Sequence, residues 1–219
     1  MLVVLLSAGC SATALELSGT SSSTAAPSST APAVALDARQ VLERLPVKGR
    51  APKTGYSREQ FGAAWADVDG DRCDTRNQVL QAQLTNVRLE ARSTCVVLEG
   101  DLADPYTGRT IHFVRAGSFD HSIDIDHLVP LGNAWQTGAQ QLNEVQREAL
   151  ANDPLNLRAT DPGANRQKGD SDAASWLPAN KAYRCDYVAG QVVVKAKYGL
   201  WLTGAERDAV LRVLQSCPG

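Results

Sequence analysis

Four cysteines beyond residue 70 constrain the fold of this chain more than any other feature. They are Cys73, Cys95, Cys185 and Cys217. No two of them have the two-residue spacing of a zinc knuckle, and none stands beside a histidine as a fellow ligand would. Two disulfides formed in an oxidising compartment are therefore expected. Pairing between sequence neighbours would give Cys73–Cys95 and Cys185–Cys217, although four cysteines allow three connectivities.

The first 35 residues have the composition of an export signal followed by a tether. Met1 to Gly9 is an apolar run that ends in small residues directly before a fifth cysteine, Cys10. This order is typical of a signal peptide with a bacterial lipobox over residues 1–10, in which Cys10 is lipidated. A cleaved secretory signal with an incidental cysteine is the alternative. Residues 11–35 are rich in Ser, Thr, Ala and Pro, which predicts a disordered linker. We expect an extracellular or cell-envelope protein, held at the bacterial membrane through a lipid on Cys10.

Residues 36–219 are expected to form one α+β domain. The chain is 43% hydrophobic, which allows a sizeable core, and its length suits one domain with appendages. Its formal net charge of −2 argues against a polybasic nucleic-acid binder, whose affinity comes from many phosphate contacts.

The spacing of apolar residues predicts the elements of this domain. Helices are expected over residues 36–45, 58–66, 77–84, 139–151, 162–168 and 203–215. Shorter β-prone runs predict a hairpin made by residues 95–101 and 109–115, and strands within residues 123–131 and 155–159. Four cations near the C-terminus form either a basic flank for DNA or a solvated face: Lys181, Arg184, Lys195 and Lys197.

An aspartate-rich turn invites a calcium interpretation. Asp67, Asp69 and Asp71 match the first three ligand positions of an EF-hand loop. However, Arg72 stands where that loop needs glycine, and Gln78 stands where it needs a bidentate glutamate. We therefore favour a turn that caps the following helix, and a calcium-dependent surface module remains an alternative.

The stretch from residue 124 to residue 170 carries polar groups that a core does not require. It opens with DIDHLVP (residues 124–130) and closes with Asn156-Leu157 and then NRQKGD (residues 165–170). Hydrolysis of a phosphodiester needs an activated water, charge neutralisation at phosphorus and help for the departing oxygen. His127 is suited to take a proton from water near neutral pH. Asp126 and Asn165 offer hard oxygen ligands for Mg²⁺ or a similar cation.

This pattern resembles the HNH endonucleases of the ββα-metal (His-Me finger) superfamily, and most of all the secreted bacterial members related to the GmrSD type. The resemblance covers about residues 122–178 and implies a ββα-metal finger braced by flanking helices, a β-hairpin and two disulfides. It also implies that Asp126 and Asn165 hold a divalent metal, that His127 is the general base, and that Asn156 braces the loop orienting His127. The expected products carry 5′-phosphate and 3′-hydroxyl ends.

The remaining assignments are less specific. Lys168 is expected to contact the scissile or adjacent phosphate, with Arg166 as the second choice. Asp124 shares a strand face with Asp126 and either supports the metal from behind its ligands or is structural. Mg²⁺ is the first expectation, with Mn²⁺ or Ca²⁺ as alternatives, and the expected substrate is nucleic acid, DNA first, cleaved by a monomer. The competing hypothesis is a non-catalytic envelope lipoprotein that binds nucleic acid or a cation.

Overall fold

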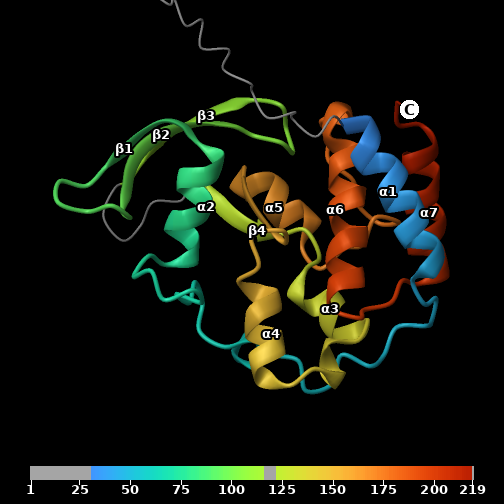
Figure 1. Cartoon of the computed structure of the whole chain (residues 1–219). Helices are drawn as coiled ribbons and strands as arrows, with labels where there is room; N and C mark the ends of the chain where they lie inside the picture. The colour runs from blue at the N-terminus through green and yellow to red at the C-terminus, as the bar shows by residue number, and fades with distance from the viewer. Residues whose placement is uncertain (1–30, 116–121, 219) are drawn as a thin grey trace, which may run out of the picture.

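The computed structural model describes residues 31–115 and 122–218, with side chains from Ala38 onward. The predicted signal peptide, Cys10 and the linker up to residue 30 lie outside the described residues. The rest forms the expected α+β domain, in which a helical layer and a three-stranded sheet stand on either side of a central strand–strand–helix unit (Figure 1).

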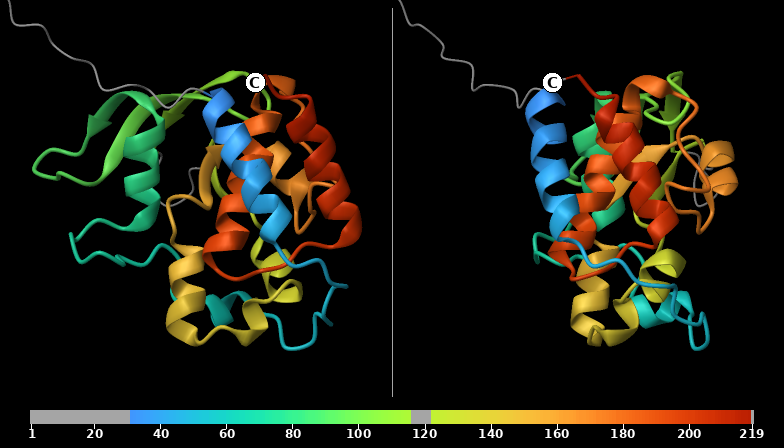
Figure 2. Two further views of the ribbon diagram at one scale, coloured as in Figure 1. Left: turned by 45° about the vertical axis from the view of Figure 1, so that its right-hand side comes forward. Right: turned by 90° about the vertical axis from the view of Figure 1, so that its right-hand side faces the viewer.

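Three long helices make up the helical layer, and both views of Figure 2 show them side by side. They are α1 (Ala31–Arg44), α6 (Arg184–Lys197) and α7 (Gly204–Gln215). Helix α7 begins with the predicted capping box, in which the Thr203 side chain accepts from the Glu206 N–H and the Glu206 side chain accepts from the Thr203 N–H. The Cys185–Cys217 disulfide joins the start of α6 to the chain just after α7. No helix among the described residues has the length and apolar character needed to cross a bilayer.

The three-stranded sheet contains the predicted hairpin and one further strand. Strands β2 (Val97–Ala103) and β3 (Thr110–Val114) pair antiparallel, and β1 (Thr85–Leu89) pairs antiparallel with β2. Helix α2 (Thr75–Gln83) packs between this sheet and the central unit, and the Asp74 side chain caps its first turn. The Cys73–Cys95 disulfide ties the start of α2 to the chain that enters β2. Both disulfides therefore have the sequence-local pairing.

The central unit runs strand, insertion, strand, helix. Strand β4 (Asp124–His127) pairs antiparallel with β5 (Leu157–Thr160), and α5 (Pro162–Lys168) follows β5 directly. The insertion between the two strands carries α3 (Leu131–Gln136), a 3₁₀ turn η3 (Ala139–Gln141) and α4 (Glu144–Ala151). Apolar residues of β4 and β5, with Ile123 directly before β4, complete the core under the sheet: Ile123, Ile125, Leu157 and Ala159.

Several predicted boundaries were wrong. The helix expected over residues 58–66 is only a 3₁₀ turn, η1 (Arg58–Phe61), because Gly62 leaves the helical region with φ 76°. The helix expected over residues 139–151 is split, since Asn143 forms a capping box with Gln146 and starts α4 afresh. Helix α1 begins at Ala31, inside the stretch expected to be linker. A further 3₁₀ turn, η4 (Lys181–Tyr183), leads into α6.

Two of the four cations near the C-terminus, Lys195 and Lys197, form ion pairs within the protein. Lys195 is fully buried and its Nζ lies 2.6 Å from Glu206 Oε1 of α7. Lys197 pairs at 2.6 Å with Asp153, whose carboxylate is itself buried. Lys195 therefore joins α6 to α7, and Lys197 joins α6 to the chain between α4 and β5.

Candidate active site

His127 ends β4, and its ring makes one hydrogen bond within the described part of the chain. Its ring is 7% exposed, and Nε2 lies 2.8 Å from the carbonyl oxygen of Ala151, the last residue of α4. A carbonyl only accepts, so Nε2 carries the proton and Nδ1 keeps its lone pair. Burial, assisted by the charges of Arg58 and Lys168, lowers the pKa of His127 to about 4, although the bond to Ala151 opposes this shift. The ring is therefore neutral near pH 7, with an available basic nitrogen.

Asn156 braces the loop that follows His127. Its side chain is fully buried, and Oδ1 accepts a hydrogen bond of 2.8 Å from the Val129 N–H. Its backbone carbonyl accepts from the Leu128 N–H at 2.7 Å. The amide Nδ2 points to the Leu150 carbonyl at 3.3 Å, one residue before the carbonyl that holds the histidine. Asn156 thus links both sides of the His127 environment without itself facing a cavity.

Asp126 is held from two sides in the interior. Its side chain accepts from Tyr106 Oη at 2.5 Å and from Lys168 Nζ at 2.9–3.0 Å. Burial raises the pKa of Asp126, and Lys168 and Tyr106 act against that rise. An ionised carboxylate has about four acceptor positions, so these partners leave an acceptor position for a further ligand in the cavity that Asp126 lines.

Lys168 does not reach the place expected of it. The residue is 1% exposed, and its Nζ donates to Asp126 and, at 2.7 Å, to the backbone carbonyl of His127. Burial lowers the pKa of Lys168, against the attraction of Asp126. The predicted phosphate contact does not fit this geometry, and Lys168 instead fixes Asp126 and the end of β4 to α5.

Asn165 and Asp124 form a second pair between α5 and β4. Asn165 Nδ2 donates to Asp124 Oδ2 at 3.0 Å. Because the carboxamide is planar, this bond turns the Asn165 oxygen, the atom expected to bind a metal, away from Asp124. Asp124 therefore orients Asn165, consistent with a supporting role. Arg166 lies on the exposed side of α5 and does not belong to the lining of the cavity described next.

A cavity of about 160 Å³ brings the predicted residues together. Asp126, His127 and Asn165 line it, along with Arg58 and Asp170. Asp170 follows α5 and pairs with Lys53 at 2.5 Å. The sequence carried no role for Asp170 or Arg58, although both stand beside the expected site. Two carboxylates and one amide oxygen around a small cavity suit a hard divalent cation that keeps several waters, so these residues fit the implied metal.

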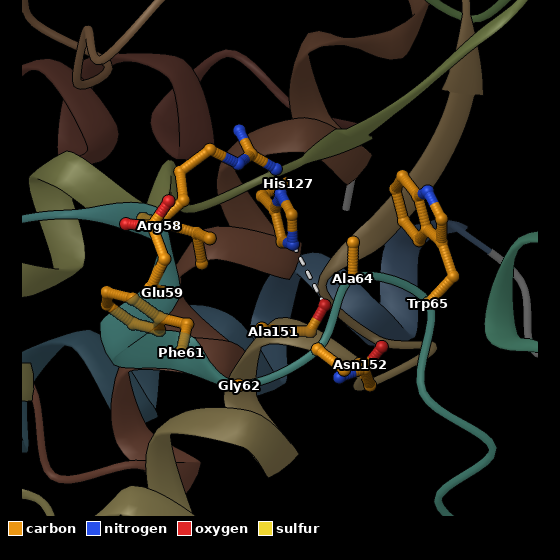
Figure 3. A pocket seen from close by; sticks show the side chains of 11 residues that line it. Arg58, Glu59, Phe61, Gly62, Ala64, Trp65, His127, Ala151 and Asn152 are labelled. Carbon is orange, nitrogen blue, oxygen red and sulfur yellow. Dashed lines mark hydrogen bonds between the residues drawn. The ribbon is translucent and has the colours of Figure 1, made fainter.

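A larger cavity of about 320 Å³ lies on another side of His127 (Figure 3). Arg58 and His127 line both cavities. In Figure 3 the Arg58 guanidinium lies beside the His127 ring, and the Trp65 ring faces the histidine from across the cavity. Trp65 belongs to the stretch 58–66 that was expected to be helical, but it lies in a loop and its ring is parallel to that of His127 within 8°.

The aspartate turn is a separate feature. Oxygens of Asp67, Asp69 and Asp71 lie within 4.8 Å of one another and are exposed. They are engaged with the turn itself, since Asp67 accepts from the Gly70 and Arg72 N–H groups and Gln78 donates to Asp69. This matches the favoured interpretation of a turn that precedes α2.

Comparison with protein families agrees with the site. The model of the GmrSD restriction endonucleases, C-terminal domain, matches residues 74–213, which is more than half of the chain. The chain belongs to this family. An uncharacterized secreted protein of Arthroderma benhamiae is 37% identical over 198 residues, covering 89% of this chain and 92% of that protein. No solved structure matches the chain.

The GmrSD match covers the whole central unit and one cysteine of each disulfide. The partner cysteines, Cys73 and Cys217, lie just outside the matched residues. It includes every residue expected to act in catalysis or metal binding. Arg58 and Trp65 lie before its first residue. A family pattern therefore could not have identified these two, and only the folded structure brings them to His127.

Proposed function

We propose that this chain is an exported, metal-dependent HNH endonuclease that hydrolyses phosphodiester bonds of nucleic acid, with DNA as the first expectation. The observation that carries the proposal is the state of His127: a neutral ring, tied by Nε2–H to Ala151, in a cavity shared with Asp126 and Asn165. A nuclease needs an available base and oxygen ligands at one place. Membership of the restriction endonuclease family supports the same chemistry.

The residues have separate tasks in this proposal. Nδ1 of His127 takes the proton from the attacking water, and the Nε2–H bond to Ala151 keeps the ring in the tautomer that can do so. Asp126 and Asn165 would hold the cation, Lys168 and Tyr106 position Asp126, and Asp124 positions Asn165. When bound, a divalent cation supplies positive charge beside the phosphate and the departing oxygen.

Arg58 replaces Lys168 as the proposed phosphate contact. It is exposed, it lines both cavities, and Figure 3 shows its guanidinium beside His127. A guanidinium presents several donors in a plane, which suits the oxygens of a phosphate. Its charge also disfavours protonation of His127, which keeps the base neutral while the substrate is absent.

Export is the second part of the proposal. The apolar leader, the two disulfides and the name of the Arthroderma relative as a secreted protein support it. The lipid anchor at Cys10 stays a prediction from the sequence. Membrane fractionation of wild type and Cys10→Ser tests it: the variant should leave the membrane fraction, and an unchanged distribution would show that there is no anchor.

Plasmid cleavage by the oxidised full chain tests the nuclease. We expect nicking and linearisation with Mg²⁺ or Mn²⁺, no cleavage with EDTA, and product ends that carry 5′-phosphate. A reaction with calcium in place of magnesium separates metal binding from catalysis. Both cations accept oxygen ligands, but they differ in the coordination geometry that they prefer. One observation favours the competing hypothesis of a non-catalytic binder, namely that Lys168 and Tyr106 already engage Asp126. Binding of DNA without cleavage under any of these metals would establish that alternative.

A further inference from the structure

We propose that the space between the rings of Trp65 and His127 receives one unpaired base of the nucleic-acid substrate, next to the phosphate that is cleaved. This inference rests on the proposed function and narrows its substrate class. The two rings are parallel within 8°, and their centroids are 6.4 Å apart. Atoms in direct contact lie about 3.5–4 Å apart, so a ring inserted between two others needs about 7 Å. A small outward movement of Trp65 would open that space.

The cavity around these rings has the chemistry of a base-binding site. Apolar atoms of Phe61, Ala64 and Leu131 line it, and Arg58 supplies a positive charge at the side shared with the smaller cavity. Figure 3 shows the Ala64 side chain below the space between Trp65 and His127, where a larger side chain would fill it. A nucleotide has this same combination, because a flat apolar face lies close to an anionic phosphate.

The backbone at Trp65 is unusual for a bulky residue. Trp65 has φ 57°, a left-handed conformation that bulky residues rarely adopt. Such conformations cluster at binding sites, where surrounding structure holds them. Here the partly buried Trp65 side chain packs against the core under the three-stranded sheet. The residues before it are Gly62, Ala63 and Ala64, which leave the face toward His127 clear.

The inserted base must be unpaired. In a duplex both faces of a base are covered by its neighbours, so a base enters a pocket between two rings only when it is single-stranded or turned out of the helix. Stacking on aromatic rings is tolerant of base identity, because every base has a π face. The enzyme should therefore prefer single-stranded or locally unpaired nucleic acid over intact duplex, without a strong sequence preference.

Cleavage of matched oligonucleotides tests this inference. The substrates are a single-stranded DNA oligonucleotide, the same strand with one abasic nucleotide at successive positions, and the annealed duplex. Wild type should cleave the single strand faster than the duplex and lose activity when the abasic nucleotide adjoins the cleaved bond. Trp65→Ala should lower kcat/KM on the intact single strand about tenfold to a hundredfold, the range that base–aromatic stacking produces, and Trp65→Phe should recover most of it. On the strand with the abasic nucleotide at the sensitive position, the three proteins should be equal.

A second variant and a binding readout keep the test decisive. Ala64→Leu fills the space from an exposed position and should mimic Trp65→Ala while leaving the fold intact. Intrinsic tryptophan fluorescence should be quenched by an oligothymidylate in wild type but far less in Trp65→Phe. If the substitutions at Trp65 and Ala64 change the cleavage rate by the same factor on intact and abasic strands, the base site is refuted. The proposed nuclease activity is not affected by that result. Quenching that depends on Trp65, in a protein that cleaves nothing, would support the site and refute the nuclease.

Discussion

Two buried lysine–carboxylate pairs occupy opposite parts of this protein and have different surroundings. In the helical layer, Lys195 of α6 lies 2.6 Å from Glu206 of α7, and its Nζ also donates to the Trp201 carbonyl at 3.0 Å. In the central unit, Lys168 of α5 lies 2.9 Å from Asp126 of β4. Both lysines are fully buried, and burial lowers the pKa of each.

The difference lies in what each carboxylate does next. Glu206 is enclosed between helices, and its side chain also accepts from the Thr203 N–H as part of a helix cap. Asp126 lines a cavity with His127 and Asn165, and a tyrosine shares the work of holding it. A buried ion pair is therefore no evidence of function by itself. The site is identified by the open cavity and the free base beside the pair.

The largest expected effect separates the two carboxylates by activity. Asp126→Asn keeps the shape of the side chain but removes its charge, which weakens any cation held there. We expect kcat/KM to fall at least about a hundredfold, since a catalytic metal contributes several kcal/mol to the barrier. Glu206→Gln is the matched control and should leave kcat/KM of the folded protein unchanged. Equal losses in the two variants would mean that both pairs are only structural.

Stability should respond to both pairs in the same way. Lys195→Met leaves Glu206 buried without a partner, which costs about 3–5 kcal/mol of unfolding free energy, whereas Lys195→Met/Glu206→Leu should return close to wild type. Lys168→Met should cost a similar amount for the same reason. Denaturant unfolding measures these values. The double variant Lys168→Met/Asp126→Leu should regain stability but not activity, and recovery of cleavage in it would contradict the assigned site.

Acid should affect the central unit through His127. Its pKa falls from the ordinary 6.5 to about 4 on folding. The unfolded chain therefore binds a proton between these values when the folded chain does not, so this contribution to stability is present above pH 6.5 and lost as the pH falls toward 4. The shift corresponds to about 3 kcal/mol. Unfolding between pH 7.5 and 4 should show this loss in wild type and in Lys195→Met/Glu206→Leu, but not in His127→Ala.

The smallest effect concerns the two arginines near the site. Arg58→Ala should reduce kcat/KM about tenfold, mainly through KM, as one charge-assisted contact to phosphate is lost. Arg166→Ala, the second choice from the sequence, should change it little because Arg166 is exposed and does not line the cavity that contains His127. If Arg166→Ala lowers kcat/KM more than Arg58→Ala does, the phosphate contact belongs to Arg166 of α5.

How much of the fold and of the candidate site could be predicted depends on the distance along the chain between the residues that contact one another. Helix α5 was predicted at its observed bounds, because Pro162 and Gly169 mark its two ends locally. The roles proposed for His127 and Asn156 rest on a motif between residues 124 and 170, and they stay predictions. By contrast, Tyr106 is 20 residues before Asp126, to which its hydroxyl donates. Arg58 and Trp65 lie beside His127 although they are about 60–70 positions earlier in the chain.

The buried position of Lys168, which differs from the expected phosphate contact, has a related physical cause. From the sequence, a lysine three residues after Asn165 is a plausible phosphate ligand, since a free ammonium is a good point charge. On α5 that spacing places Lys168 one turn further along, where it enters the interior beneath β4. A lysine on a helix enters the core only where a buried group of opposite charge can pair with it. Asp126 could not be recognised as that group from spacing alone.

Replacement of the two histidines in parallel tests the central claim most directly. His127→Ala removes the proposed base, and His112→Ala removes an exposed histidine that bonds to Asp101 on the three-stranded sheet. Cleavage of a single-stranded oligonucleotide with Mg²⁺ should fall about a hundredfold to ten-thousandfold in His127→Ala, the usual contribution of a general base, and stay at the wild-type rate in His112→Ala. Equal rates in wild type and a folded His127→Ala protein would contradict the account.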